Sequence, residues 1–256
     1  MSNEQPDTDQ SEAWSQTDDG EIDYPEGDTD TDSTGTTDDG SDAQQNSPDT
    51  TSSDGNSDTS EPRREVARRV FATEFNDATY TFKESSEDRA PVYALLPTGE
   101  RANRVFVAGT LTETQDVGSE SEYWQGRVVD PSGTFFVYAG QYQPEAATVL
   151  REAEPPVYVS IVGKPRTYET DDGEMNVSLR PESISITDAG TRDRWVVETA
   201  LRTVERASDA ETDPTEYDQM AAERYERSPE QYKQDAISVL EELDTDAESQ
   251  TADPTP

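Results

Sequence analysis

The sequence predicts a mainly β protein built around one small closed barrel of five strands. From position 104 to 187 the chain reads, in order, as strand, strand, tight turn, strand, helix, strand and strand. The helical stretch falls between the third and fourth strands. This order is typical of a five-stranded Greek-key barrel of the oligonucleotide-binding (OB) kind. We expect helices to flank the barrel and acidic extensions to lie at both ends of the chain.

The composition indicates that only part of the 256 residues folds into this barrel. Hydrophobic residues make up 30% of the chain, and the formal net charge is -38. Residues 1–60 hold 18 acidic residues and no Lys or Arg, so they cannot bury enough apolar surface to offset chain entropy. We expect four parts: a disordered acidic tail (1–60), a helix and short strands packing on the barrel (61–103), the OB-fold domain with its C-terminal helix (104–208), and an acidic, partly disordered helical extension (209–256).

The surplus of acid is typical of a protein that works in molar salt. Only Lys83, Lys164 and Lys233 are lysine among the 20 basic residues, and cysteine is absent. Surplus carboxylates keep such proteins soluble while salt screens their mutual repulsion. An ordinary acidic, partly disordered protein is the alternative. We favour the halophile interpretation because the region expected to fold shares the acidic bias.

Several classes of function lack their usual residues. The chain has no Cys and no His, which removes thiol chemistry, zinc sites and the commonest general base. It has no P-loop and no GxSxG motif, so we expect neither an enzyme nor a cofactor. The loop Asp171-Asp172-Gly173-Glu174 departs from the calcium-loop pattern. No apolar run is long enough to cross a bilayer, and we expect a cytoplasmic protein.

The region before the barrel is expected to begin with a helix. Ser60 suits the N-cap and Pro62 the first turn. Apolar residues then recur at helical spacing: Val66, Ala67, Val70, Phe71 and Phe75. Arg63, Arg64, Arg68 and Arg69 are either the solvated face of this helix or a patch that contacts phosphate. Short strands are expected at 78–82 and 92–96, followed by a turn at 97–100.

The barrel elements have recognisable bounds. The strands are expected at 104–114, 122–130, 134–140, 157–163 and 175–187, and the helix at 144–154. Gly109 could mark a bulge in the first strand, and Pro181 should bend or split the fifth. Asp130-Pro131-Ser132-Gly133 is a reverse turn with Pro at its second position. Lys164-Pro165-Arg166 is assigned to the loop between the fourth and fifth strands.

Helices are expected after the barrel. Trp195, Val196, Ala200, Leu201 and Val204 recur with a period of 3.6 residues, so this helix should pack on the barrel. A short helix is expected within 214–227, and a longer one should start at Ser228-Pro229. The longer helix has an apolar stripe formed by Tyr232, Ala236, Val239, Leu240 and Leu243. It either folds back on the barrel or recognises another protein.

The second and third strands carry the candidate binding surface. Single strands of nucleic acid lie across these strands in OB folds, between the loops that join strands one to two and four to five. Because Gln125 and Arg127 share a face, that face should point outward and Trp124 inward. Aromatic rings stack on bases, and Arg pairs with phosphate. The candidate nucleic-acid-binding residues are Tyr123, Gln125, Arg127, Phe136, Tyr138, Tyr142, Lys164 and Arg166. The alternative is that the aromatic residues form barrel core.

Three stretches of the chain resemble the haloarchaeal replication protein A (RPA) family: VFVAGTLTE, GRVVDPSGTFFVYAGQYQPEA and VSIVGKP. More narrowly, the chain is similar to the small OB-fold protein associated with the RPA large subunit. The resemblance implies single-stranded DNA binding in DNA replication, recombination and DNA repair, with that large subunit as partner. Larger members often carry a zinc finger, which this chain lacks, and this favours an accessory role.

Two functions follow from these observations. In the first, the chain is a single-stranded-DNA-binding accessory subunit of an RPA-like complex. In the second, it is an OB-fold interaction module that binds the RPA large subunit without contacting DNA. Neither function involves a membrane or a small-molecule substrate.

Overall fold

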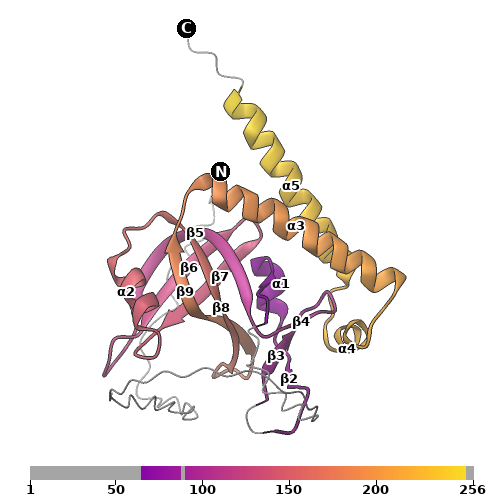
Figure 1. Ribbon diagram of the computed structural model, residues 1–256, viewed down its shortest axis with the longest axis horizontal. Coiled ribbons are helices and arrows are strands. Elements are labelled where there is room, and N and C mark those ends of the chain that lie inside the picture. The colour runs from indigo at the N-terminus through magenta and orange to yellow at the C-terminus, as the bar shows by residue number, and fades with distance from the viewer. Residues whose placement is uncertain (1–64, 88–89, 252–256) are drawn as a thin grey trace, which may run out of the picture. The chain divides into compact units, whose positions relative to one another are not determined.

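The computed structural model describes residues 65–87 and 90–251, so the tail predicted at 1–60 lies outside the described residues. The elements of the described chain are shown in Figure 1. In chain order they are β1 (Arg68–Arg69), α1 (Ala72–Asp77), β2 (Thr81–Lys83), β3 (Val92–Leu95), β4 (Arg101–Ala102), β5 (Val105–Asp116), β6 (Trp124–Asp130), β7 (Gly133–Ala139), α2 (Pro144–Glu152), β8 (Val157–Glu169), β9 (Met175–Ile186), α3 (Ala189–Thr212), α4 (Glu216–Arg224) and α5 (Pro229–Thr251).

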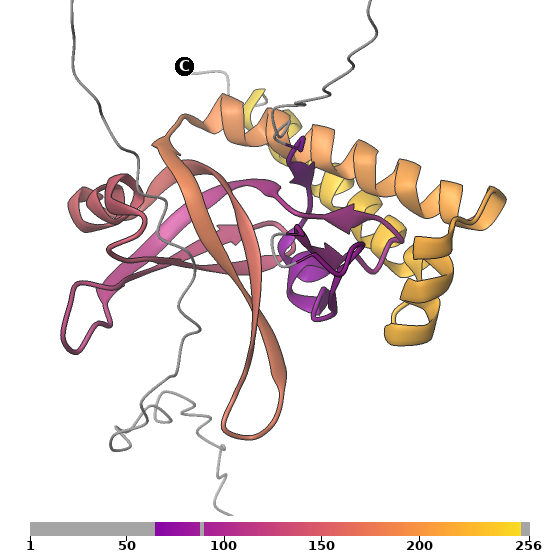
Figure 2. The ribbon, with the colours of Figure 1, turned by 60° about the horizontal axis from the view of Figure 1, so that its bottom comes forward.

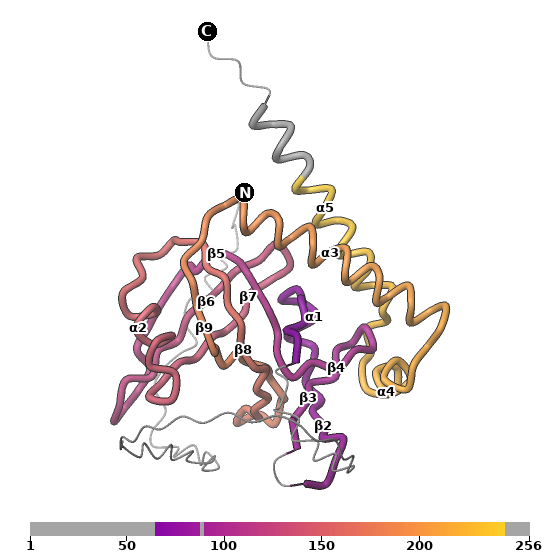
Figure 3. The backbone as a smooth tube through the Cα atoms, in the orientation of Figure 1, coloured from indigo at the N-terminus to yellow at the C-terminus, as the bar shows by residue number. Residues whose placement is uncertain are grey.

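Five of these strands close a barrel. The strand order is β5-β6-β7-β9-β8, and β5 pairs back with β8. The ladders are antiparallel except for the parallel pair β7–β9. Helix α2 connects β7 to β8, and Figure 3 follows the chain through this path. The protein is therefore mainly β, with the predicted Greek-key OB barrel and flanking helices.

The alternation of the strands decides what lies inside the barrel. Successive side chains of a strand point to opposite faces, so every second residue enters the core. Trp124 is half-buried and packs against this core, as the sequence predicts. The other inward residues are fully buried and mostly β-branched or aromatic: Val105, Val107, Leu111, Val128, Phe135, Val137, Val159, Ile161 and Leu179.

Helices pack against the barrel where its strands leave gaps. Leu150 of α2 is completely buried, and α2 contacts β5, β6, β7 and β9. Phe75 of α1 is also completely buried, and its ring centroid lies 5.4 Å from that of Phe135. Helix α1 contacts both β7 and β9, whose ladder contains a single registered pair. The two helices therefore complete the core that the five strands leave open.

The predicted helix over 62–75 is wrong within the described residues. Glu65 to Ala67 are irregular, β1 is extended, and the helix begins only at Ala72. Tertiary pairing overrides the helical spacing, because the Arg68 N–H donates to the carbonyl of Arg104 at 2.8 Å. The buried Asp130 carboxylate then accepts the N–H of Ala72 at 2.9 Å, which fixes the first turn of α1.

Two further expectations concern irregularities in the barrel strands β5 and β9. The bulge of β5 does not lie at Gly109, since the register with β6 shifts between Leu111 and Glu113. Gly109 instead allows a close approach of β6, because a Cβ there would lie 2.4 Å from the carbonyl oxygen of Val129. Strand β9 is not split at Pro181, since it runs unbroken from Met175 to Ile186, but its register with β8 shifts between Val162 and Gly163, the partner of Pro181.

The C-terminal helices cover another side of the domain. Helix α3 packs on β5 and β8, and the Trp195 indole Nε1 donates to the carbonyl of Phe106 at 3.0 Å. Helix α5 packs along α3 and buries Tyr232 and Ala236 of its apolar stripe. The Tyr232 hydroxyl donates to Asp77 of α1 at 2.6 Å. Helix α5 therefore folds back on the domain, which is the first of the two alternatives given for it.

A second, smaller sheet lies beside the barrel. It has the order β2-β3-β4, with the predicted turn at 97–100 between β3 and β4. Helix α4 packs against it, because the ring of Tyr217 lies 5.8 Å from that of Phe82. Among the helices of the described chain, none is long and apolar enough to span a membrane.

Candidate nucleic-acid interface

One side of the barrel sheet turns its side chains away from the core. In the β6–β7 ladder Gln125 is paired with Tyr138, and Arg127 with Phe136. Directly paired residues of an antiparallel ladder point to the same side. Because the alternate residue Val128 is completely buried, these four side chains point outward.

The aromatic end of this face is held in a defined geometry. The rings of Tyr123 and Tyr138 stack with centroids 5.7 Å apart and planes inclined by 19°. The Gln125 side-chain amide donates to the Tyr138 hydroxyl at 2.5 Å. Gly140 leaves room for the Tyr123 ring, since a Cβ there would lie 2.8 Å from it. The two rings are therefore positioned before any ligand arrives.

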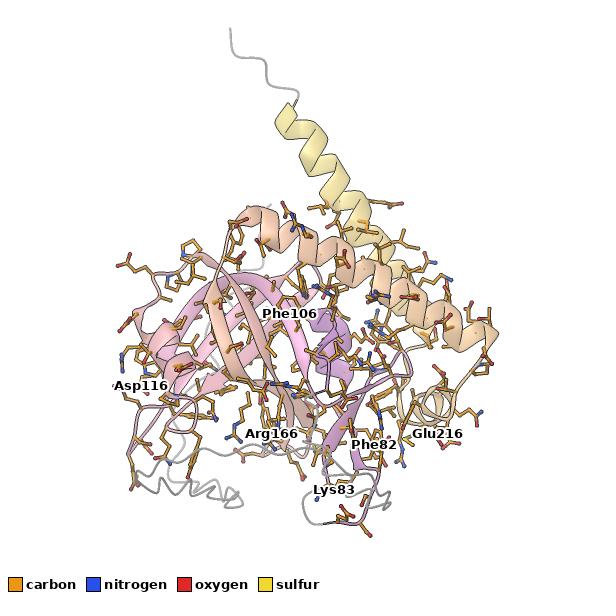
Figure 4. The ribbon with its side chains drawn as sticks, viewed as in Figure 1. Phe82, Lys83, Phe106, Asp116, Arg166 and Glu216 are labelled. Atoms are coloured by element: carbon orange, nitrogen blue, oxygen red, sulfur yellow. The ribbon has the colours of Figure 1, made fainter. Side chains whose placement is uncertain are left out.

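The loop between β5 and β6 also positions Tyr123. The Asp116 carboxylate accepts the backbone N–H groups of Tyr123 and Gly118, both at 3.0 Å. These two hydrogen bonds stabilise the charged form and lower the pKa of Asp116. Figure 4 shows Asp116 at the loop end of β5.

Arg127 lies next to the aromatic end. Its guanidinium carbon is 5.9 Å from the centre of the Phe136 ring, and its Nη1 is 3.4 Å from a carboxylate oxygen of Glu113 on β5. Both side chains of this ion pair are about half exposed, at 47% and 55%. An exposed pair of this kind contributes little, so Arg127 can exchange Glu113 for another anion at small cost.

Three cations lie side by side on the β8–β9 hairpin, and we call Lys164, Arg166 and Arg180 the cationic row. Lys164 is paired directly with Arg180, and Arg166 with the neighbouring Ser178. Like charges placed opposite one another destabilise a sheet. The pKa of Arg166 lies below its ordinary value. The larger cause is desolvation of the guanidinium, and the second is the positive charge of Arg180.

The cationic row lacks acidic partners. Over residues 65–87 and 90–243, no ion pair involves Lys164, Arg166 or Arg180. Over the same residues, Arg68 pairs with Glu100 at 2.9 Å and Arg104 with Glu182. In a chain with 58 acidic and 20 basic residues, an acid-free group of three cations is unusual.

The position of Lys164 and Arg166 corrects the sequence prediction. Both belong to β8, not to a loop, because the ladder with β9 continues as far as Glu169 and Met175. Pro165 does not end the strand, since its missing N–H is tolerated where the hairpin runs beyond the pairing with β5. The connecting loop is therefore confined to residues 170–174.

The aromatic end and the cationic row belong to one surface. The parallel pair Val137–Leu179 joins β7 to β9, and both residues are buried inside the barrel. The residues that flank this pair on the outer side are Phe136 and Tyr138 on β7 and, on β9, Arg180 and Ser178, which is itself buried. We call the whole surface the outer face; it comprises Glu113, Tyr123, Gln125, Arg127, Phe136, Tyr138, Lys164, Arg166, Ser178 and Arg180. Arg166 is labelled in Figure 4, on the barrel side where the β8–β9 hairpin projects.

The outer face contains seven of the eight residues that the sequence predicts. Tyr142 is the exception. It lies between β7 and α2, is 75% exposed, and makes no ring contact with another aromatic residue of the described chain. Arg180 was missed by the sequence analysis. The alternation of polar Ser178 and Arg180 with apolar Val177 and Leu179 could have identified it as an outward residue of the fifth barrel strand.

The other basic cluster of the chain takes part in packing. Arg68 pairs with Glu100, and the guanidinium of Arg69 lies 4.7 Å from the centre of the Phe106 ring. Arg63 and Arg64 lie outside the described residues. The described part of the chain also contains no group of three or more acidic side chains close enough to hold a metal ion, including the loop at 171–174.

No protein-family model matches the chain, and no curated protein matches it. Among solved structures, the OBody AM2EP06 bound to hen egg-white lysozyme is 22% identical over 33% of this chain and 80% of its own, with a TM-score of 0.28.

Two yeast structures are also among the similar solved structures. The mitochondrial single-stranded DNA binding protein Rim1 of S. cerevisiae is 16% identical over 34% of this chain and 94% of its own, with a TM-score of 0.27. The yeast Stn1 and Ten1 structure is 11% identical over 56% of this chain and 75% of its own, with a TM-score of 0.38. Because these values are low, the OB fold is assigned here from the strand order itself.

Proposed function

We propose that this protein is a single-stranded-DNA-binding accessory subunit of an RPA-like complex, and that the outer face is its binding surface. One observation carries the proposal: the face holds four cations and one carboxylate in a chain whose net charge is -38. Three of those cations form the acid-free cationic row. Two like charges that lie opposite each other, as Lys164 and Arg180 do, destabilise the sheet. A bound anionic ligand would offset this repulsion, which favours a binding role for the cationic row.

The arrangement suits a single strand better than a duplex. The rings of Tyr123, Phe136 and Tyr138 offer surfaces for unpaired bases, and each stacked base contributes about 1–3 kcal/mol. The cationic row and Arg127 supply contacts to phosphate, and Arg can also stack on bases. Bases would therefore lie over the rings of β6 and β7, and phosphates near Arg127 on β6 and over the cationic row on β8 and β9.

The salt dependence of this binding should be shallow. A single strand that contacts all four cations releases at most four counterions, which gives a slope of about -3 for log K against log salt. At 1 M salt the Debye length is about 3 Å, so distant carboxylates of the protein hardly repel the strand. Stacking persists under these conditions, and it fits the halophile interpretation of the composition.

The finer part of the proposal comes from the resemblance to the RPA family. It comprises the RPA large subunit as partner and a role in DNA replication, recombination and repair. No catalytic step is part of this proposal.

The test is a fluorescence titration of the full chain with oligo-dT in 1 M KCl, alone and with the RPA large subunit. The variant Arg166→Gln/Arg180→Gln should weaken binding at least about tenfold, since each charge-assisted contact contributes about 1.5–3 kcal/mol. The matched control is Arg194→Gln/Arg202→Gln, which removes the same charge from exposed positions of α3 and should bind as the wild type does.

Two outcomes would contradict the proposal. Equal weakening by the two double variants would mean that the effect is one of net charge and not of the outer face. Absence of binding with and without the large subunit would leave the second candidate function, an interaction module that holds its partner without touching DNA. Co-purification with the large subunit after nuclease treatment is the result that this second function predicts.

A further inference from the structure

The tip of the β8–β9 hairpin has the opposite charge to its stem. Glu169, Asp171, Asp172 and Glu174 lie at the tip, where residues 169–174 contain no basic residue. Asp171, Asp172 and Glu174 are exposed, and none of the four forms an ion pair in the described part of the chain. The hairpin therefore passes from a cationic stem to an acidic end.

Hydrogen bonds close this acidic tip. The N–H of Thr170 donates to the carbonyl of Glu174, and the N–H of Gly173 donates to the carbonyl of Thr170, both at 2.8 Å. Gly173 has a φ of +80°, which the turn requires. The carboxylates are thus carried by a defined turn at the end of a regular ladder. Figure 2 shows the hairpin projecting away from the barrel.

The distance from the cationic row to the tip sets the range of the repulsion. A strand rises about 3.3 Å per residue, so Glu169 at the end of β8 lies roughly 10 Å beyond Arg166, and the turn at 170–174 carries the other three carboxylates past that point. The Debye length is about 10 Å at 0.1 M salt and about 3 Å at 1 M. A phosphate that continued past Arg166 along the hairpin would therefore meet strong repulsion at low salt and much less at high salt.

We propose that the acidic tip of the β8–β9 hairpin limits the footprint of the bound strand. The inference rests on the proposed function, and it adds which part of the outer face the ligand occupies. The strand covers β6, β7 and the stem of the hairpin and leaves the protein before the tip. The hairpin does not close over the ligand as a clamp. The footprint is accordingly short, near the lower end of the roughly 4–16 nucleotides that an OB fold covers.

The experiment measures affinity against oligo-dT length, from 4 to 16 nucleotides, with the full chain. The tip variant is Asp171→Asn/Asp172→Asn/Glu174→Gln. Its matched control is Glu198→Gln/Glu205→Gln/Asp209→Asn, which removes three exposed carboxylates from α3. The titrations run at several KCl concentrations from 0.1 to 2 M. Near-UV circular dichroism at each concentration identifies the conditions in which all three proteins are folded, and only those are compared.

For the wild type we expect affinity to stop rising at a short length. At the lowest usable salt, the tip variant should bind the longer oligomers about two- to fivefold more tightly, plateau at a greater length, and leave the shortest oligomer unaffected. The gain should vanish in 1 M KCl, and the control should behave as the wild type.

If the wild type binds but the tip variant has the same plateau and affinities, the footprint inference is overturned while the proposed function stands. The footprint inference is also overturned if the affinity of the control variant for the longer oligomers rises as much as that of the tip variant. If no oligomer binds to any of the three proteins, either alone or with the RPA large subunit, the proposed function itself fails.

Discussion

Tyr138 is the residue whose removal should be most informative. Its ring stacks on Tyr123, its hydroxyl accepts a hydrogen bond from Gln125, and it flanks the junction between β7 and β9. The change Tyr138→Ala removes one stacking surface and leaves Tyr123 without its neighbour. Loss of one base stack costs about 1–3 kcal/mol, which weakens binding of oligo-dT about 5- to 150-fold.

The matched variant Tyr138→Phe separates stacking from hydrogen bonding. It keeps the ring and removes only the hydroxyl that Gln125 contacts at 2.5 Å. A hydrogen bond of this kind contributes about 1 kcal/mol, so the affinity should change less than about fivefold. The ratio of the affinities of the two variants for oligo-dT therefore measures the contribution of the Tyr138 ring.

The assay is fluorescence anisotropy of labelled oligo-dT in 1 M KCl, where long-range attraction is screened. Urea unfolding of each variant identifies any loss of fold. The reasoning is refuted if folded Tyr138→Ala binds within twofold of the wild type, or if Tyr138→Phe loses as much affinity as Tyr138→Ala.

Three further predictions concern the neighbouring ion pair, the core and a helix cap. Glu113→Gln frees Arg127 from its exposed partner and should raise the affinity for oligo-dT about two- to fivefold, measured by the same anisotropy assay; a loss of affinity would contradict the role given to Arg127. Phe75→Ala removes a completely buried ring and should lower the free energy of unfolding by about 3–5 kcal/mol in urea titrations; a cost below 1 kcal/mol would mean that α1 does not complete the barrel core. The pKa of Asp188 lies below its ordinary value of 3.8 because the N–H of Thr191 donates to its carboxylate, so Asp188 stabilises the fold above that pH and loses this effect as the pH falls through its folded pKa. Asp188→Asn keeps an acceptor at the N-cap but cannot titrate, so its stability difference from the wild type should shrink between pH 5 and 3; a difference that stays constant would contradict the assignment.

The barrel could be predicted from the sequence because its signals are local. The period-2 alternation around Val128, the turn at 130–133 and the Pro-led helix α2 each depend on a few neighbouring residues. Burial of one face then makes the alternation reliable. Which of Phe135 and Phe136 points outward stayed open in the sequence, because it depends on the pairing of Phe136 with Arg127.

The errors arose where distant pairing decides the structure. The spacing of Val70 and Phe75 fits a helix, but the parallel pairing of Arg68 and Arg69 with β5 extends the chain there. The length of β8 could not be predicted from the sequence either. Pro165 reads as a strand terminator, whereas a hairpin running beyond the barrel tolerates it. The cationic row was therefore predicted only in part, and Arg180 was not connected with Lys164, since their pairing depends on the register of the hairpin.

The central claim is that the outer face binds single-stranded DNA. Its most direct test is photo-crosslinking of the full chain to oligo-dT carrying 4-thiothymidine, with the attached peptides identified by mass spectrometry. The account predicts crosslinks within residues 122–140 and 163–181, the segments that contain the rings of β6 and β7 and the cationic row. Crosslinks concentrated on α3, α4 or the small sheet β2-β3-β4 would contradict it.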